Sequence, residues 1–264
     1  MTIVVAVACP EGLVLGADSR SSTFGDRGGR VATDYAQKVF SVGGKVGVVT
    51  SGYAFVDGNT IAGLMEEFEA QTKPSEDVDD VAERLRDYFH ARLEKHFEAY
   101  PNDKPPEGAD ALGFIVGGYD DKGIGRIKLL YLPTKTIIEG ATTAANQCGA
   151  HWDGETQVLS RLVKGWDAAY IDVSGWPEDH VQALQKAEYL TPFGRMALQD
   201  AVDFATFAIR TTIDMQRFTD GTVGNPGSFP TCGGTAELVA INARGLTWLQ
   251  ETKLRATVVR GDPT

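Results

Sequence analysis

The order of the predicted elements favours an α+β fold in which two antiparallel sheets lie between layers of helices. Strand-like apolar runs come first, two amphipathic helical segments follow, and then come further strands, three helical segments and a final strand pair. A doubly wound α/β chain would instead alternate strand and helix one by one. The sequence contains no tandem repeat, heptad run or phosphate-binding glycine motif.

The composition indicates a single domain spanning residues 1–264, which is long enough to bury a sizeable core. Lys and Arg together number 25 and Asp and Glu number 36, so the net charge is −11. A surface with this balance repels phosphate backbones, which argues against nucleic acid as a partner.

The sequence also indicates the location of the protein and the redox state of its cysteines. No apolar run approaches the roughly 20 residues of a membrane span, and no basic segment precedes an apolar core at the N-terminus. We therefore expect a cytoplasmic protein without membrane contact. Cys9, Cys148 and Cys232 are odd in number and widely spaced, which favours reduced thiols over a disulfide framework. We expect no cofactor and no metal.

The first twenty residues predict a buried hairpin. Residues 3–9 and 13–17 are apolar runs, and Pro10-Glu11-Gly12 forms a turn between them. Asp18 follows at the end of the second run, where it is either a turn former or a site residue.

The next stretch contains a lysine in an apolar setting. Residues 21–30 predict a polar loop and residues 31–41 an imperfectly alternating strand, in which Lys38 precedes Val39 and Phe40. The local sequence favours a solvent-facing lysine whose aliphatic stem is packed. Gly43-Gly44 predicts a hairpin turn into a strand over 45–51.

Helical spacing begins after Gly52. Ile61, Leu64, Met65 and Phe68 predict a helix over roughly 54–72 that starts directly after this glycine. Pro74-Ser75 opens a second helix that extends to Phe97, and we expect its His90 and His96 at the surface or its boundary. Residues 101–110 are rich in turn formers and predict a loop.

The second half of the chain repeats the pattern of strands and helices. Thr191-Pro192 predicts the start of the longest helix, with proline at its first position. A loop over 219–234 follows. The other predicted elements are strands at 112–117, 127–132 and 136–138, a short strand or loop at 141–149, helices at 155–164 and 177–189, and closing strands at 235–241 and 246–249.

Thr2 is the candidate nucleophile. If Met1 is removed, Thr2 carries both a hydroxyl nucleophile and a free α-amino group. That amine titrates at about 7.7 to 8.0 and lysine at about 10.4, so the amine can act as a general base near neutral pH. While Met1 is attached, the same nitrogen is an amide, and we predict an inactive chain. No G-x-S-x-G elbow or histidine triad signature supports Ser-His chemistry.

The chain resembles the proteasome β-subunit family of N-terminal nucleophile hydrolases in the order of four residues, Thr2, Asp18, Lys38 and Gly52. The resemblance suggests a bacterial or archaeal relative of that family. The motifs that carry the resemblance are GADSR at 16–20, AQKVF at 36–40, TSG at 50–52 and CGGTAELVAI at 232–241. The resemblance implies a four-layer αββα sandwich.

The resemblance also implies a role for each of the four residues. Thr2 would be the nucleophile of a threonine peptidase, Asp18 and Lys38 would tune it, and the Gly52 N–H would stabilise the oxyanion. A lysine ammonium favours the deprotonated amine and the alkoxide, and a buried aspartate compensates the lysine charge. The implied partners are a peptide or unfolded-protein substrate, further copies of the chain that assemble into a ring, and an ATPase.

Some positions depart from the family's pattern. Cys148-Gly149 stands where many members carry Ser-Gly, and both Asp214 and Asp220 are candidates for an aspartate after the long helix. Two alternatives therefore remain open, a non-catalytic structural or binding subunit and an amidase for a small-molecule amide. The loops at 21–30 and 219–231 would decide between a peptide and a small amide.

Overall fold

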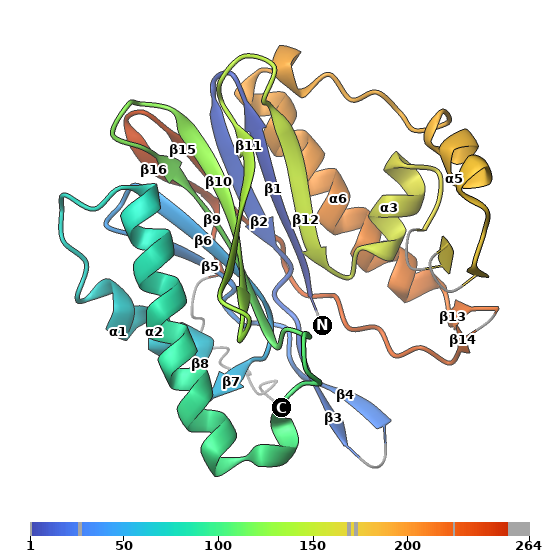
Figure 1. Cartoon of the computed structure of the whole chain (residues 1–264), viewed down its shortest axis with the longest axis horizontal. Coiled ribbons are helices and arrows are strands. Elements are labelled where there is room, and N and C mark those ends of the chain that lie inside the picture. Colours follow the sequence, from blue (N-terminus) through green and yellow to red (C-terminus); the bar gives the residue numbers. More distant parts are fainter. Residues whose placement is uncertain (1, 26–27, 168–169, 172–173, 224, 253–264) are drawn as a thin grey trace, which may run out of the picture.

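The computed structural model describes residues 2–25, 28–167, 170–171, 174–223 and 225–252. Two five-stranded antiparallel sheets pack face to face, and helices cover both outer faces (Figure 1). The predicted four-layer αββα sandwich is therefore confirmed. None of the described helices combines the length and the apolar character that a membrane span requires.

The first sheet contains the N-terminal hairpin. Its strand order is β12-β1-β2-β15-β16. Every residue of β1 and β2 is buried, as predicted, because the hairpin lies in the middle of the sheet with α6 on one face and the second sheet on the other. The strands are β1 (Ile3–Cys9), β2 (Gly12–Ala17), β12 (Gly149–Gly154), β15 (Glu237–Asn242) and β16 (Gly245–Gln250).

The second sheet has the order β11-β10-β9-β6-β5. Glycines allow it to lie close to the first sheet: a Cβ on Gly117 would lie 2.7 Å from a Leu15 methyl group, and one on Gly47 would lie 2.9 Å from an Ile241 methyl group. The strands are β5 (Val39–Val42), β6 (Val46–Gly52), β9 (Leu112–Tyr119), β10 (Gly125–Leu132) and β11 (Thr136–Thr142).

Three small hairpins lie outside the sheets. They are β3 (Ser21–Gly25) with β4 (Gly28–Thr33), β7 (Phe55–Val56) with β8 (Asn59–Thr60), and β13 (Gly221–Thr222) with β14 (Asn225–Pro226). The predicted loop over 21–30 and the predicted strand over 31–41 are therefore wrong in part. A strand begins only at Val39, because the chain first completes β4 and then crosses irregularly to the edge of the second sheet.

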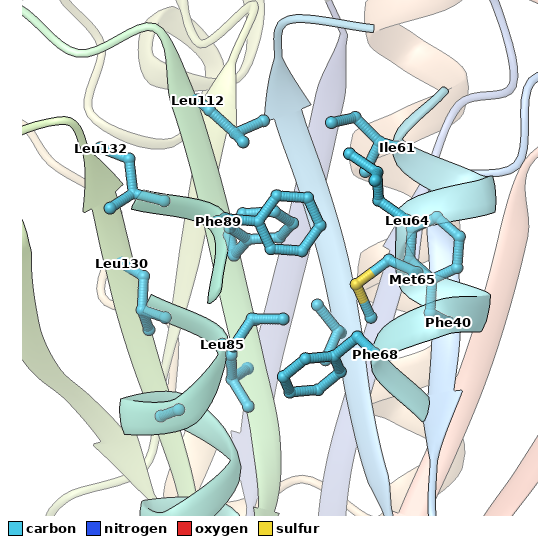
Figure 2. Close-up of a cluster of buried hydrophobic side chains, with 14 of the residues drawn as sticks. Phe40, Ile61, Leu64, Met65, Phe68, Leu85, Phe89, Leu112, Leu130 and Leu132 are labelled. Carbon is cyan, nitrogen blue, oxygen red and sulfur yellow. The ribbon is translucent and has the colours of Figure 1, made fainter. Parts of the chain in front are cut away.

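Two helices cover the second sheet, α1 (Ile61–Glu69) and α2 (Val78–Ala99). The start predicted for the first helix at 54 is wrong, since the β7–β8 hairpin comes before it and the Thr60 hydroxyl caps the helix at the Gly63 N–H, 3.1 Å away. Figure 2 shows how the apolar faces of both helices meet the sheet, with side chains that include Leu64, Phe68, Leu85 and Phe89.

The first sheet is covered by α3 (Gln157–Val163) and α6 (Leu198–Phe218), while α5 (Glu178–Gln185) lies farther out (Figure 1). The predicted helix start at Thr191-Pro192 is wrong, because a 3₁₀ turn over Phe193–Arg195 follows the proline and α6 begins later. With 21 residues, α6 is also one residue shorter than α2.

His151 links β12 to β11 and should make the fold sensitive to acid. Its Nε2 accepts a hydrogen bond from the Ala141 N–H at 2.9 Å, and burial lowers the pKa of its imidazole. The unfolded chain, in which histidine titrates at about 6.5, then binds more protons than the folded chain. The contribution of neutral His151 to the free energy of unfolding is therefore complete above about pH 6.5 and is lost as the pH falls below that value.

We expect urea unfolding between pH 7.5 and 5 to show a smaller fall in the free energy of unfolding for His151→Gln than for the wild type, because glutamine can accept the same bond without titrating. His180→Gln, at an exposed position, is the control and should follow the wild type. Equal pH slopes for wild type and His151→Gln would contradict this prediction.

Candidate active site

Thr2 lies directly before β1 and beside the end of β2. The antiparallel pairing of Val4 with Ala17 brings these two strand ends together. Thr2 is only 4% exposed, and its carbonyl accepts a hydrogen bond from the Glu155 N–H at 2.7 Å. Its backbone is therefore fixed within the first sheet, with the side chain at one end of the sandwich.

Asp18 is a fully buried carboxylate at the end of β2. Four donors surround it, three of them backbone N–H groups, so the charge is well compensated. Oδ1 accepts from Ile3 N at 3.1 Å and Lys38 Nζ at 2.8 Å, and Oδ2 accepts from Arg20 N at 3.2 Å and Gly233 N at 2.9 Å.

Lys38 comes directly before β5 and points inward. Its Nζ donates to Thr2 Oγ1 and to Asp18 Oδ1, and its side chain is 9% exposed. The solvent-facing interpretation from local sequence is therefore wrong. The apolar neighbours Val39 and Phe40 reflect burial between the layers rather than an exposed strand.

Gly52 is the last residue of β6, and no helix begins directly after it. Its φ is +95°, and a Cβ there would lie 2.3 Å from the Ala111 carbonyl oxygen. The next residue, Tyr53, donates its N–H to that same oxygen at 2.9 Å. Both the dihedral angle and the close approach of Ala111, the residue before β9, therefore require glycine at this position.

Replacing Gly52 with alanine should lower both stability and any turnover, since the backbone must move away from Ala111 O. We expect a loss of at least about 2 kcal/mol, of which about 1 to 2 kcal/mol comes from the positive φ alone. Gly123→Ala is the matched control, because Gly123 has φ +77° and nothing within 4 Å of the added Cβ. Thermal unfolding of both variants measures the difference, and equal losses would contradict the steric argument.

A cavity of about 920 Å³ opens beside these residues. Its lining includes Ser21, Ser22 and Thr23 from the loop predicted over 21–30, but no described residue of the loop predicted over 219–231. Its lining also includes Thr2, Lys38, Thr50, Ser51, Gly52, Tyr53, Phe55, His96 and Asp103.

His96 lies on the cavity wall rather than at the surface or its boundary, contrary to expectation. It is 7% exposed. Its Nδ1 accepts the Asp57 N–H at 3.2 Å, and its Nε2 lies 3.2 Å from Asp103 Oδ2. This arrangement ties α2 to the β7–β8 hairpin and shapes the cavity.

An ion pair secures the rim of the cavity. Arg20 donates to both oxygens of Asp34, at 2.6 and 3.1 Å, and to the Pro230 carbonyl at 3.3 Å. The hydrogen bond from the Arg20 guanidinium lowers the pKa of the Asp34 carboxyl. Three chain segments that meet at the site are thereby held together.

Comparison with known proteins gives a match at the level of structure. No protein-family model matches the sequence, and a search of curated proteins finds no match. A solved Anbu Gly-1 mutant from Hyphomicrobium sp. strain MC1 matches with a TM-score of 0.58 and 14% identity over 95% of this chain and 86% of the other. Anbu from Yersinia bercovieri, described as an ancestral beta-subunit, matches with a TM-score of 0.56 and 14% identity over 94% and 88%.

A third match is a helical assembly of the Anbu complex from Pseudomonas aeruginosa, with a TM-score of 0.55 and 18% identity over 91% of this chain and 81% of the other. The chain shares the fold of these Anbu proteins. The expected membership of the proteasome β-subunit family is therefore wrong, since the matched structures are Anbu proteins. Motifs of a few residues could not separate families that share one fold.

The structure does not bring Cys148 to Thr2. Gly149 pairs with Ala8 and Gly154 with Ile3, so Cys148 lies beyond the end of β1 that is opposite to Thr2. At about 3.4 Å per residue, Gly149 is already about 17 Å along β12 from Gly154. A role for the Cys148-Gly149 pair beside Thr2 is therefore excluded.

The two candidate aspartates also lie elsewhere. Asp214 forms ion pairs with Arg210 at 3.0 Å and Arg217 at 3.7 Å on the surface of α6. Asp220 is exposed, and its carbonyl accepts the Gly227 N–H. In the part of the chain that the structure describes, neither carboxylate bonds to Thr2, Asp18 or Lys38.

Sequence reasoning missed another polar group, which is connected to Thr2 through the bond from the Glu155 N–H to the Thr2 carbonyl. The Glu155 carboxylate accepts the Thr231 hydroxyl at 2.8 Å, and Gln216 bonds to Thr231 Oγ1 at 3.3 Å and to Cys232 N at 2.7 Å. Burial raises the pKa of the Cys232 thiol, which keeps it protonated. The only sequence signal that could have pointed to Glu155 as a site residue was its position directly after the strand that ends at Gly154. Among the described residues, no group of three His, Cys, Asp or Glu side chains is placed to hold a metal ion.

Proposed function

We propose that this single-domain chain is an N-terminal threonine hydrolase that cleaves peptide bonds after Met1 is removed. One observation carries the proposal: Lys38 Nζ contacts both Thr2 Oγ1 and the buried Asp18 carboxylate beside a large cavity. An ammonium held against a hydroxyl stabilises the alkoxide that must form there.

The chemistry proceeds in two halves. The free α-amino group of Thr2 takes the hydroxyl proton as Oγ1 attacks the amide carbonyl carbon. The Gly52 N–H stabilises the oxyanion, and the tetrahedral intermediate expels the amine, which leaves with that proton. Water then attacks the acyl ester and gives a proton to the α-amine, the bond between the acyl carbon and Oγ1 breaks, and the α-amine returns that proton to Oγ1, which frees the acid product and regenerates Thr2.

The cavity supports a peptide substrate over a small amide. A volume of about 920 Å³ exceeds what one amino-acid amide fills, and polar side chains from β3 and the end of β6 line it. Fluorogenic tri- and tetrapeptides should therefore be hydrolysed with a kcat/KM at least tenfold above that of single amino-acid amides. The reverse order would favour a small-amide amidase, and no hydrolysis of either would favour a non-catalytic subunit.

We further propose that the chain forms a homo-oligomer, because the Pseudomonas aeruginosa Anbu structure is a helical assembly. A ring, a cytoplasmic location and an ATPase that delivers unfolded protein belong to the same proposal. Light scattering coupled to gel filtration measures the mass in solution, with an oligomer expected, and electron microscopy distinguishes a ring from a helical arrangement. A monomer at all concentrations would contradict the assembly.

A further inference from the structure

We infer that Glu237 is a positioning residue, which fixes the backbone of Lys38 so that its ammonium reaches Thr2. This inference rests on the proposed function of Lys38. Glu237 lies at the start of β15 and is fully buried. Its Oε2 accepts the N–H groups of Lys38 at 3.1 Å and Val39 at 3.4 Å, and its Oε1 accepts the Thr252 N–H at 3.2 Å.

The burial of this carboxylate is costly and calls for a reason. In the described part of the chain, Glu237 forms no ion pair, and its hydrogen bonds come from backbone N–H groups. An apolar side chain would fill the same space between two sheets without the desolvation cost of a charge. The role of the carboxylate is therefore to accept hydrogen bonds from these backbone N–H groups, two of which belong to Lys38 and Val39.

The fold places Glu237 and Asp18 at opposite ends of the same lysine. Glu237 pairs with Ala17 across β15 and β2, so both carboxylates come from neighbouring strand ends of the first sheet. Asp18 bonds to the ammonium, whereas Glu237 bonds to the backbone N–H. The Lys38 carbonyl accepts the Thr50 N–H at 3.1 Å. The backbone N–H, the carbonyl oxygen and the ammonium of Lys38 are thus each held by a hydrogen bond.

This anchoring matters because Lys38 precedes β5 rather than lying within a strand. Without Glu237, the backbone at Lys38 and Val39 would lose its link to the first sheet, and the ammonium could move away from Thr2. A displacement of about 1 Å at a reacting group costs about 100-fold in rate. Glu237 does not line the cavity, so substrate binding should be unaffected.

Three variants test the inference in the full chain. Glu237→Ala should lower kcat by about 100-fold with KM within about twofold of the wild type. Glu237→Gln should recover most of this loss, because its amide oxygen can still accept both N–H groups. Glu237→Asp keeps the charge but shortens the reach, so it should recover less than Glu237→Gln. If the alanine variant does not fold, the glutamine and aspartate variants carry the comparison.

Glu76→Ala is the matched control, since Glu76 is another buried carboxylate, paired with Arg84 at 2.8 Å at the start of α2 and outside the cavity lining. It should lose stability with kcat unchanged. Wild-type kcat in folded Glu237→Ala, or in folded Glu237→Asp if the alanine variant does not fold, a loss confined to KM, or the same kcat loss in Glu76→Ala would each overturn the inference. A wild-type chain, freed of Met1, that reacts with no threonine-directed probe would instead overturn the proposed function.

Discussion

Thr2→Ala is expected to abolish peptide hydrolysis, with a fall of about 10³-fold or more, while the fold is retained. The substitution removes the only atom proposed to form the acyl ester, and loss of a nucleophile costs enzymes of this kind most of their rate. Thr2 lies at the edge of the core, so the loss of its methyl and hydroxyl groups should cost only about 1 kcal/mol. Turnover of a fluorogenic peptide and thermal unfolding measure the two effects.

Thr2→Ser provides the control for this variant. Serine retains a hydroxyl beside a free α-amine, and Ala, Ser and Thr are all small enough to permit removal of Met1. The serine variant should therefore remain active and be inactivated by the same probes. Wild-type turnover in Thr2→Ala would show that the nucleophile lies elsewhere.

Lys38→Ala should be nearly as damaging to turnover and should also destabilise the fold. It leaves the fully buried Asp18 carboxylate without its cation, and breaking a buried pair in this way costs about 3 to 5 kcal/mol. Urea unfolding and peptide turnover measure the two losses.

Lys128→Ala is the matched control, because Lys128 is also buried but its partners Asp79 and Glu139 are 47% and 61% exposed. Water can solvate those carboxylates, so the stability loss should be about 1 kcal/mol and turnover should be unchanged. Adding Asp18→Asn to Lys38→Ala should restore part of the stability without restoring turnover. A Lys38→Ala variant with wild-type turnover would contradict the mechanism.

The sequence predicted those parts of the fold whose burial leaves a clear pattern. Residues 3–9 and 13–17 are apolar without interruption because they lie between two layers, and this pattern sufficed to predict the hairpin. The β3–β4 hairpin was missed because most residues of β4 are exposed, so they carry no clear alternating apolar pattern. The start of α1 was placed too early because the apolar spacing from Ile61 to Phe68 does not mark where the helix begins, and the turn at Asp57-Gly58 and the cap at Thr60 were not used.

For the candidate site, local sequence could not give the direction of a side chain. Lys38 beside two apolar residues fits either an exposed strand or a buried ion pair, and only the contact with Asp18, twenty positions earlier, distinguishes them. Glu237 was not recognised, since the backbone groups it accepts from are 199 and 198 positions away. Glu155 was missed because its link to Thr2 runs through its main-chain N–H, which any residue could supply.

The most direct test of the central claim is the intact mass of the purified protein after exposure to a threonine-directed β-lactone or epoxyketone. The proposed mechanism predicts a species that lacks Met1 and carries one adduct, located on Thr2 by peptide mapping. A chain that retains Met1 and carries no adduct would contradict it and would favour a non-catalytic subunit.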